Sequence, residues 1–145
     1  MIAHELRADG SKLVHCHGCF DLSHVGHVKH LQAAKRFGSV LIVTITPDCY
    51  VNKGNNRPVF NEHLRAESVA ALECVDYVAI NKWPTACEAI RMLHPHIFAK
   101  GEEYRERKTA ELTSEEAAVL SVGGRVEFTD GFAFSTTELI RRITA

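Results

Sequence analysis

The sequence lacks the features that place a chain in a membrane or on nucleic acid. None of its apolar runs approaches the length of about 18 residues that marks a membrane-spanning helix. Its 17 lysines and arginines are matched by 18 aspartates and glutamates, which gives a formal net charge of -1. General nucleic-acid binders usually carry a strong basic excess. We therefore expect no membrane span and no nucleic-acid partner, although a few local cations suffice to bind a small anion.

A disulfide framework and a signal peptide are missing as well. The five cysteines are odd in number and irregularly spaced, which fits a reducing compartment. Residues 1–12 are polar and lack the apolar stretch of a signal peptide. The sequence holds no internal repeat, low-complexity stretch or linker. We therefore expect a cytoplasmic protein in which residues 1–145 form a single domain.

Segments with the pattern of strands alternate with segments of helical spacing. Residues 40–45 form a continuous, mostly β-branched run, which is typical of a strand buried on both faces. Strands are expected at residues 13–16, 40–45, 77–80, 97–99 and 125–128. Helices are expected at residues 25–37, 61–74, 84–93, 113–123 and after Ser135. Their predicted start signals include Asn61 as a cap, Pro84 in a first turn and the capping-box pattern Thr113–Glu116. This alternation predicts right-handed βαβ units and an α/β fold: a three-layer αβα, Rossmann-like arrangement with a five-stranded parallel sheet.

The segment Gly18–His27 lies where the first strand turns into the first helix, next to the edge at which such folds bind ligands. A helix start offers unpaired backbone N–H groups and the positive end of the helix dipole. His24 and His27 are three residues apart, so they share a face and both can donate to phosphate oxygens. Gly26 between them leaves space for a bulky anion. The segment therefore predicts a phosphate site.

Residues 18–35 resemble the signature of the H-x-G-H nucleotidyltransferases. That superfamily includes glycerol-3-phosphate cytidylyltransferase and heptose-1-phosphate adenylyltransferase. The similarity continues, in the same order, through Lys53-Gly54, Arg57-Pro58-Val59, Glu62–Arg65, Lys100–Tyr104 and Ser135–Thr137. It looks closest to the adenylyltransferase domain that is often fused to a sugar kinase. Since this sequence contains no kinase, we expect a separate sugar kinase as a pathway partner.

The resemblance implies a reaction and a set of site residues. In this family a phosphate oxygen of the substrate attacks the α-phosphorus of a nucleoside triphosphate, and pyrophosphate leaves. His24, His27 and the loop lysine Lys53 are implied as catalytic. The nucleotide-binding residues would be Gly18, Cys19, Phe20, Asp21, Gly26, Lys100, Gly101, Ser135, Thr136 and Thr137. The phosphorylated substrate would meet Arg65, Glu103 and Tyr104. Mg²⁺ bridging the triphosphate is also expected, although only Asp21 stands out as a protein ligand.

Each of these residues also has a simpler interpretation. Lys53 alone would be read as a solvated loop lysine, and Arg65 as a partner of neighbouring glutamates. Ser135 has the spacing of a capping box with Glu138, which is compatible with a phosphate site at the same helix start. Asp21 has the residue type of a helix cap. The alternatives stay open on sequence alone.

The run His15–Cys19 invites a metal interpretation, but it lacks the second ligand pair that zinc sites of this type need. Alternation along a strand also separates His15 and His17 from Cys16. We therefore expect Cys16 to be a core residue, and no metal or redox module. The other cysteines outside the site, Cys49, Cys74 and Cys87, are also expected to be buried.

The nucleotide is predicted from two segments. Family cytidylyltransferases carry an arginine shortly before the Ser-Thr-Thr segment, and residues 130–134 hold none. Residues 100–104 resemble the adenylyl branch more than the cytidylyl branch. We therefore expect ATP and a sugar phosphate similar to heptose 1-phosphate. The alternatives are CTP with glycerol or polyol phosphate, and a non-catalytic nucleotide-binding module. The resemblance also implies a homodimer, for which Trp83 and Pro84 are candidate contacts.

Overall fold

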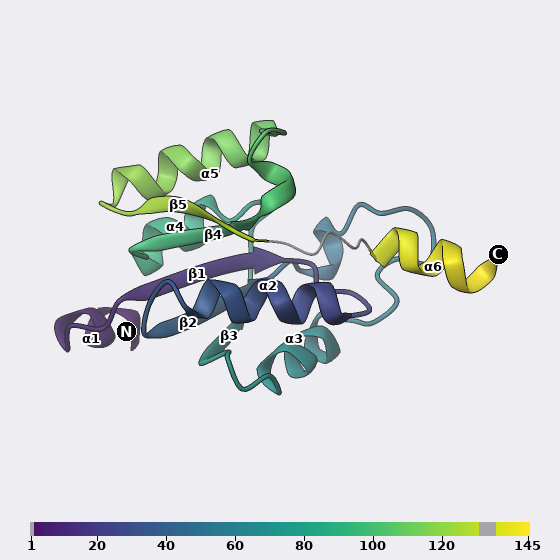
Figure 1. Cartoon of the computed structure of the whole chain (residues 1–145), viewed down its shortest axis with the longest axis horizontal. Helices are drawn as coiled ribbons and strands as arrows, with labels where there is room; N and C mark the ends of the chain where they lie inside the picture. Colours follow the sequence, from purple (N-terminus) through teal and green to yellow (C-terminus); the bar gives the residue numbers. More distant parts are fainter. Residues whose placement is uncertain (1, 131–135) are drawn as a thin grey trace.

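A computed structural model describes residues 2–130 and 136–145 of the chain. Five parallel strands form one sheet in the order β3-β2-β1-β4-β5 (Figure 1). They are β1 (Leu13–Gly18), β2 (Val40–Ile45), β3 (Tyr77–Ile80), β4 (Ile97–Gly101) and β5 (Arg125–Thr129). The five-stranded parallel sheet predicted from the sequence is confirmed, and β2 and β3 have the expected bounds.

Helices cover both faces of this sheet. They are α1 (Ile2–Ala8), α2 (Val25–Lys35), α3 (Glu62–Ala70), α4 (Cys87–Leu93), α5 (Ala110–Ser121) and α6 (Thr136–Thr144), with short 3₁₀ turns η1 (Asp48–Tyr50) and η2 (Glu102–Tyr104). Helices α2 and α3 pack on one face, whereas α1, α4 and α5 pack on the other. The fold is therefore the predicted three-layer α/β arrangement. None of the described helices has the length and apolarity to cross a membrane.

The alternation of side chains along β1 divides the core between the two faces. Val14 and Cys16 join the apolar cluster beneath α2 and α3, which includes Leu31 and Val69. Cys16 is fully buried, and burial raises the pKa of its thiol to about 12. It is thus the core residue that the sequence predicts. His15 lies on the opposite face, as alternation requires.

Several boundaries differ from the sequence predictions. Helix α1 was not expected, and α3 ends at Ala70 instead of residue 74. Pro84 precedes α4 instead of lying in its first turn. The prediction of a capping box at Thr113–Glu116 is wrong. Helix α5 begins at Ala110, and its cap is Thr109, whose side chain accepts from the Leu112 backbone N–H.

The cysteine prediction is wrong in part. Cys87 is buried, but Cys49 is exposed on η1 and Cys74 is only half-buried.

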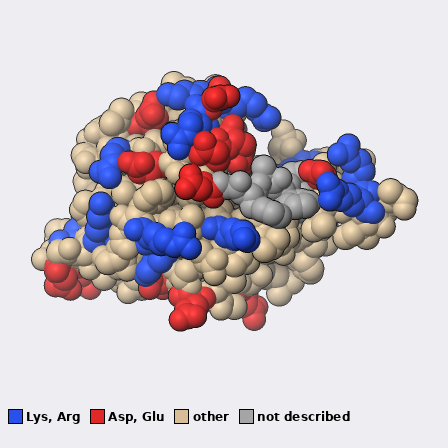
Figure 2. Space-filling model, viewed as in Figure 1, with Lys and Arg blue, Asp and Glu red and all other residues tan. Residues whose placement is uncertain are grey.

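The strand order reverses between β1 and β4, so the carboxyl ends of these two strands flank the crevice where such folds bind ligands. Helix α2 starts at this end of the sheet, and α6 lies beyond it (Figure 1). The face drawn in Figure 2 carries acidic and basic side chains interspersed, not a field of one sign.

Candidate nucleotide site

A hollow of about 210 Å³ opens at the carboxyl ends of β1, β4 and β5, beside the start of α2. Its wall includes ten of the residues predicted from the sequence: Gly18, Cys19, Phe20, Gly26, His27, Lys53, Lys100, Gly101, Glu103 and Tyr104. The structure therefore brings together predicted residues that range from Gly18 to Tyr104 in the sequence. Lys53 reaches the hollow from the long loop after β2.

His24 and His27 form the N-terminal cap of α2. The backbone N–H of Gly26 donates to Nδ1 of His24 over 3.1 Å, and the backbone N–H of His24 donates to Nδ1 of His27 over 3.2 Å. The two rings stack with their centroids 4.1 Å apart. Since both Nδ1 atoms accept, each neutral ring carries its proton on Nε2. The cap therefore fixes the tautomer of both histidines.

Both histidines of the cap are neutral at neutral pH. Burial, together with the charges of His24, Lys53 and His30, lowers the pKa of His27 to about 4. Burial also lowers the pKa of His24. His27 lines the hollow, whereas His24 is absent from the wall that the described residues form and stacks against His27. Of this pair, His27 is therefore the histidine that faces the hollow.

The turn between β1 and α2 places Phe20 against His27. Phe20 has a φ of 53° and Leu22 a φ of 48°, so the chain folds back on itself at this point. A Cβ on Gly18 would lie 2.9 Å from the Phe20 ring, so a side chain at this position would displace the ring. The ring meets His27 edge-on at 5.5 Å. Gly18 and Phe20 thus contribute to the site by supporting His27.

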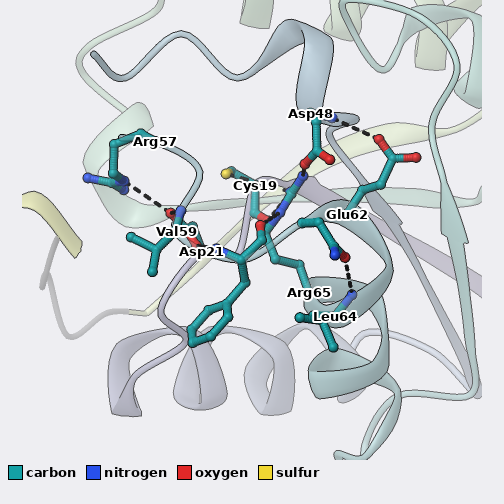
Figure 3. Close-up of polar contacts among 10 residues, drawn as sticks. Cys19, Asp21, Asp48, Arg57, Val59, Glu62, Leu64 and Arg65 are labelled. Carbon is teal, nitrogen blue, oxygen red and sulfur yellow. Dashed lines mark hydrogen bonds and ion pairs between the residues drawn. The ribbon is translucent and has the colours of Figure 1, made fainter. Parts of the chain in front are cut away.

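Arg65 is almost fully buried beneath the site. Figure 3 shows its side chain reaching from α3 past Cys19 to Asp48. The guanidinium donates to the backbone oxygen of Phe60 over 2.9 Å, to that of Cys19 over 2.8 Å, and to the Asp48 carboxylate over 2.8 Å. Arg65 is absent from the described wall of the hollow. It holds three segments around the site, and its implied contact with substrate stays a prediction.

Asp21 is also a buried anchor. Its carboxylate accepts from the Arg57 side chain over 3.0 Å and from the backbone N–H groups of Val59 and Phe60 over 2.8 and 3.1 Å (Figure 3). Burial would raise the pKa of Asp21, but these donors lower it below its usual value. The cap of α2 is His24, not Asp21. Asp21 fastens the far end of the loop that carries Lys53.

No protein metal centre is formed by the described residues, among which no three histidines, cysteines, aspartates or glutamates cluster suitably. The one sequence candidate, Asp21, uses its carboxylate on the loop.

Lys100 lies in the wall of the hollow and has a buried partner behind it. Its ammonium group is 3.8 Å from the carboxylate of Glu115 and 4.4 Å from the centre of the Tyr104 ring. Glu115 is only 4% exposed, and burial raises its pKa against the opposing charge of Lys100. Glu115 was not predicted as a site residue, since its sequence context indicated a helix cap.

Two histidines of the wall, His17 and His30, were also missed from the sequence. His17 shares the Thr44 hydroxyl with buried His15, at 2.8 and 2.7 Å respectively. Burial lowers the pKa of His17 to about 4 and that of His15 to about 3. The alternation of β1 placed His15 and His17 on one face, but no sequence signal indicated that the hollow would reach them.

The predicted Ser-Thr-Thr segment is described only in part. Ser135 and the side chain of Thr136 lie outside the described residues. Thr137 is exposed on α6 and does not contribute to the wall that the described residues form. The nucleotide contacts implied for these three residues stay predictions.

The chain belongs to the cytidylyltransferase-like family, whose pattern matches residues 15–142. This confirms the family that the motifs predict. Among curated relatives, bifunctional protein HldE of Pelobacter propionicus is 44% identical over 142 residues, covering 94% of this chain and 28% of the relative. Bifunctional protein HldE of Aliarcobacter butzleri is 40% identical over 144 residues, covering 98% of this chain and 29% of the relative. The chain therefore spans less than a third of the length of these relatives.

A solved structure shares the fold. The lipopolysaccharide core biosynthesis protein from Thermoplasma volcanium superimposes with a TM-score of 0.72, over 86% of this chain and all of that one. The sequence identity is 22%, so this likeness supports the fold alone.

Proposed function

We propose that the chain transfers the AMP group of ATP to a sugar 1-phosphate similar to heptose 1-phosphate, with release of pyrophosphate. The observation that carries the proposal is the capped histidine pair at the start of α2, of which His27 lines a hollow together with Lys53 and Lys100. A helix N-terminus, a neutral Nε2–H donor and two ammonium groups together suit a polyphosphate. The cytidylyltransferase-like family and the HldE relatives support this assignment.

The proposed chemistry needs no general base. The acceptor phosphate is ionised at neutral pH, and one of its oxygens attacks the α-phosphorus. A new P–O bond forms while the bond from the α-phosphorus to the bridging oxygen breaks, and the electron pair leaves with pyrophosphate. The protein then acts by positioning the reactants and stabilising the charge that develops. His27 would donate from Nε2 to the oxygens that gain charge, and His24 would hold its ring.

Two cations complete the site in this proposal. Lys53, on a loop fastened by Asp21, would approach the triphosphate as a mobile point charge, whereas Lys100 is held by Glu115. Mg²⁺ would arrive with ATP and neutralise part of its charge. We further propose a homodimer and a separate sugar kinase that makes the acceptor; "bifunctional" in the name of the relatives agrees with a second activity elsewhere in those longer chains.

Pyrophosphate release tests the proposal. The protein is incubated with Mg²⁺, ATP or CTP, and a panel of sugar and polyol phosphates. The proposal expects release with ATP and an aldose 1-phosphate. Release with CTP and a polyol phosphate only would assign a cytidylyltransferase instead. Nucleotide binding without release for any pair would mean a non-catalytic binding module.

A further inference from the structure

A second cavity, of about 280 Å³, adjoins the hollow where the first turns of α5 lie beside the end of β4 (Figure 1). Lys100 and Tyr104 line both spaces, so the two meet at these residues. The rest of its described wall comes from the start of α5: Thr109, Ala110, Glu111 and Glu115. We call this space the α5 cavity. A ligand whose charged group contacts Lys100 from the hollow can therefore extend into it.

Glu115 is the buried polar group of the α5 cavity. Its side chain is only 5% exposed, and the Lys100 ammonium group, at 3.8 Å, lies beyond hydrogen-bond distance. Within the described part of the chain, no side chain donates a hydrogen bond to this carboxylate. Burial raises the pKa of Glu115, whereas Lys100 and the backbone N–H of Ala86 oppose that rise. Because a carboxylate has about four acceptor positions, Glu115 keeps the capacity to bond a ligand in the cavity.

The wall of the α5 cavity suits a ligand rich in hydroxyl groups. Glu111 lies four residues before Glu115, so the two carboxylates share a face of α5. The Thr109 hydroxyl and the Tyr104 ring complete the polar wall. Lys100 already brings a positive charge to these carboxylates, which disfavours a metal ion. A purine base would prefer a mainly apolar and aromatic pocket. Sugar hydroxyls, by contrast, both donate to carboxylates and accept from other donors.

We propose that the α5 cavity holds the sugar of the acceptor, with the acceptor phosphate at Lys100 and Glu115 hydrogen-bonded to the sugar hydroxyls. This inference rests on the proposed function. Lys100 belongs to both spaces, so this placement leaves the phosphate in the hollow beside the nucleotide and turns the sugar away from it. It keeps the acceptor contact that the resemblance implies for Tyr104 and adds Glu115. Glu115 then determines specificity, because a phosphate without a sugar leaves this buried carboxylate without those hydrogen bonds.

Calorimetric titration with heptose 1-phosphate and with inorganic phosphate tests this assignment. Each titration is made with and without Mg²⁺ and α,β-methylene ATP, an analogue that cannot release pyrophosphate. The variants are Glu115→Gln and Glu111→Gln. Glu116→Gln is the matched control, because Glu116 pairs with Lys108 and is outside the described wall of the cavity.

The ratio of the two affinities carries the result. The wild type is expected to bind heptose 1-phosphate about tenfold or more tightly than inorganic phosphate, the worth of one good hydrogen bond. Glu115→Gln should lose about tenfold in affinity for heptose 1-phosphate. It should bind inorganic phosphate at least as tightly as the wild type, because the substitution removes no cation. Glu111→Gln should show a smaller loss in the same direction, and Glu116→Gln should keep the wild-type ratio.

The outcomes separate this inference from the proposed function. Equal weakening of both phosphates in Glu115→Gln would mean a structural role and overturns the assignment. Equal affinities in the wild type, or displacement of α,β-methylene ATP by heptose 1-phosphate, overturn it as well. If the ratio changes as expected but no nucleotide is transferred, the sugar site stands and the proposed function fails. If the ratio is unchanged while an ADP-sugar forms, the reverse holds. Urea unfolding verifies that each variant folds, and exposed Glu111 provides the test if Glu115→Gln does not.

Discussion

The backbone N–H of His24 donates to Nδ1 of His27 over 3.2 Å, while the two rings stack 4.1 Å apart. His24 thus caps the helix and orients the ring of His27. The spacing of three residues therefore fixes the orientation of the His27 ring as well as the face on which it lies. These contacts hold an uncharged Nε2–H donor in a fixed direction.

Substitutions that imitate one ring nitrogen at a time test this division of roles. An asparagine at position 27 can replace Nδ1 in the cap, whereas a glutamine can reach the place of Nε2. We expect His27→Asn to fold normally but to lower kcat about 10²- to 10³-fold, the usual effect of removing one donor to a developing charge. His27→Gln should retain more activity and lose stability. Steady-state kinetics and calorimetric nucleotide binding measure both effects.

The His27 prediction is contradicted by equal losses of nucleotide affinity and of kcat/KM in His27→Asn. Such losses would mean that His27 holds ground state and transition state alike.

Arg65 is expected to act on the site through the backbone it holds. Lysine cannot supply donors to Phe60, Cys19 and Asp48 together, so Arg65→Lys should lower the free energy of unfolding by about 2–4 kcal/mol. Asp48→Asn, which leaves the two backbone contacts in place, should have a smaller effect in the same direction. Urea denaturation gives both values. A stable Arg65→Lys variant with a raised KM for the sugar phosphate alone would instead support direct substrate contact.

Acidification should destabilise the protein at pH values well above those at which carboxylates titrate. His15, His17, His27 and His30 have folded-state pKa values of about 3 to 4, against 6.5 when unconstrained. Between pH 6.5 and 4 the unfolded chain therefore binds more protons, so stability falls as the pH falls. Each histidine contributes a slope of about 1.4 kcal/mol per pH unit in this window.

Urea midpoints measured from pH 7.5 to 4.5 test the acid prediction. His17→Gln should reduce the slope by about one proton, because it removes one of the four groups. His63→Ala is the matched control, since this histidine is exposed on α3. A stability that is constant from pH 6.5 to 5 would show that these histidines do not stay neutral in the folded protein.

The pair of Lys100 and Glu115 predicts a link between nucleotide and stability. Glu115→Gln keeps the size of the side chain but leaves the Lys100 charge without its buried partner, which should cost about 2 kcal/mol of stability. A bound triphosphate supplies an anion to the same lysine. Saturating ATP should therefore raise the Tm of Glu115→Gln more than that of the wild type. The control is Glu116→Gln, since Glu116 pairs with Lys108 on the surface. Equal ATP-induced shifts in all three proteins would place Lys100 outside the nucleotide contact.

The order of strands and helices was largely predictable because buried segments leave strong patterns. The β-branched run of β2 gave its bounds, and Asn61 caps α3 as expected, accepting from Leu64. Helix α1 was not predictable, since only Ala3 of it is buried. In α5, Thr113 and Ser114 had the pattern of a helix cap but lie within the helix. Their hydroxyls donate to the backbone carbonyls four residues earlier.

Residues of the hollow were predictable where a local motif or the family resemblance indicated them. Residues that reach the hollow only through packing between distant segments were not predictable. His17 and His30 line the hollow because β2 and β5 supply Thr44 and Thr129, contacts that join residues 27 and 99 positions apart. The polar partners of Arg65 come equally from distant segments. Such relationships depend on the register of the sheet and leave no mark in the spacing of any one motif.

Product identity tests the central claim most directly. The protein is incubated with Mg²⁺, equal concentrations of ATP and CTP, and heptose 1-phosphate, and the products are separated by anion exchange and weighed by mass spectrometry. Transfer of AMP predicts an ADP-sugar and pyrophosphate in equal amounts, with the CTP intact. A CDP-sugar as the main product, or release of AMP without any nucleotide sugar, would contradict the proposed function.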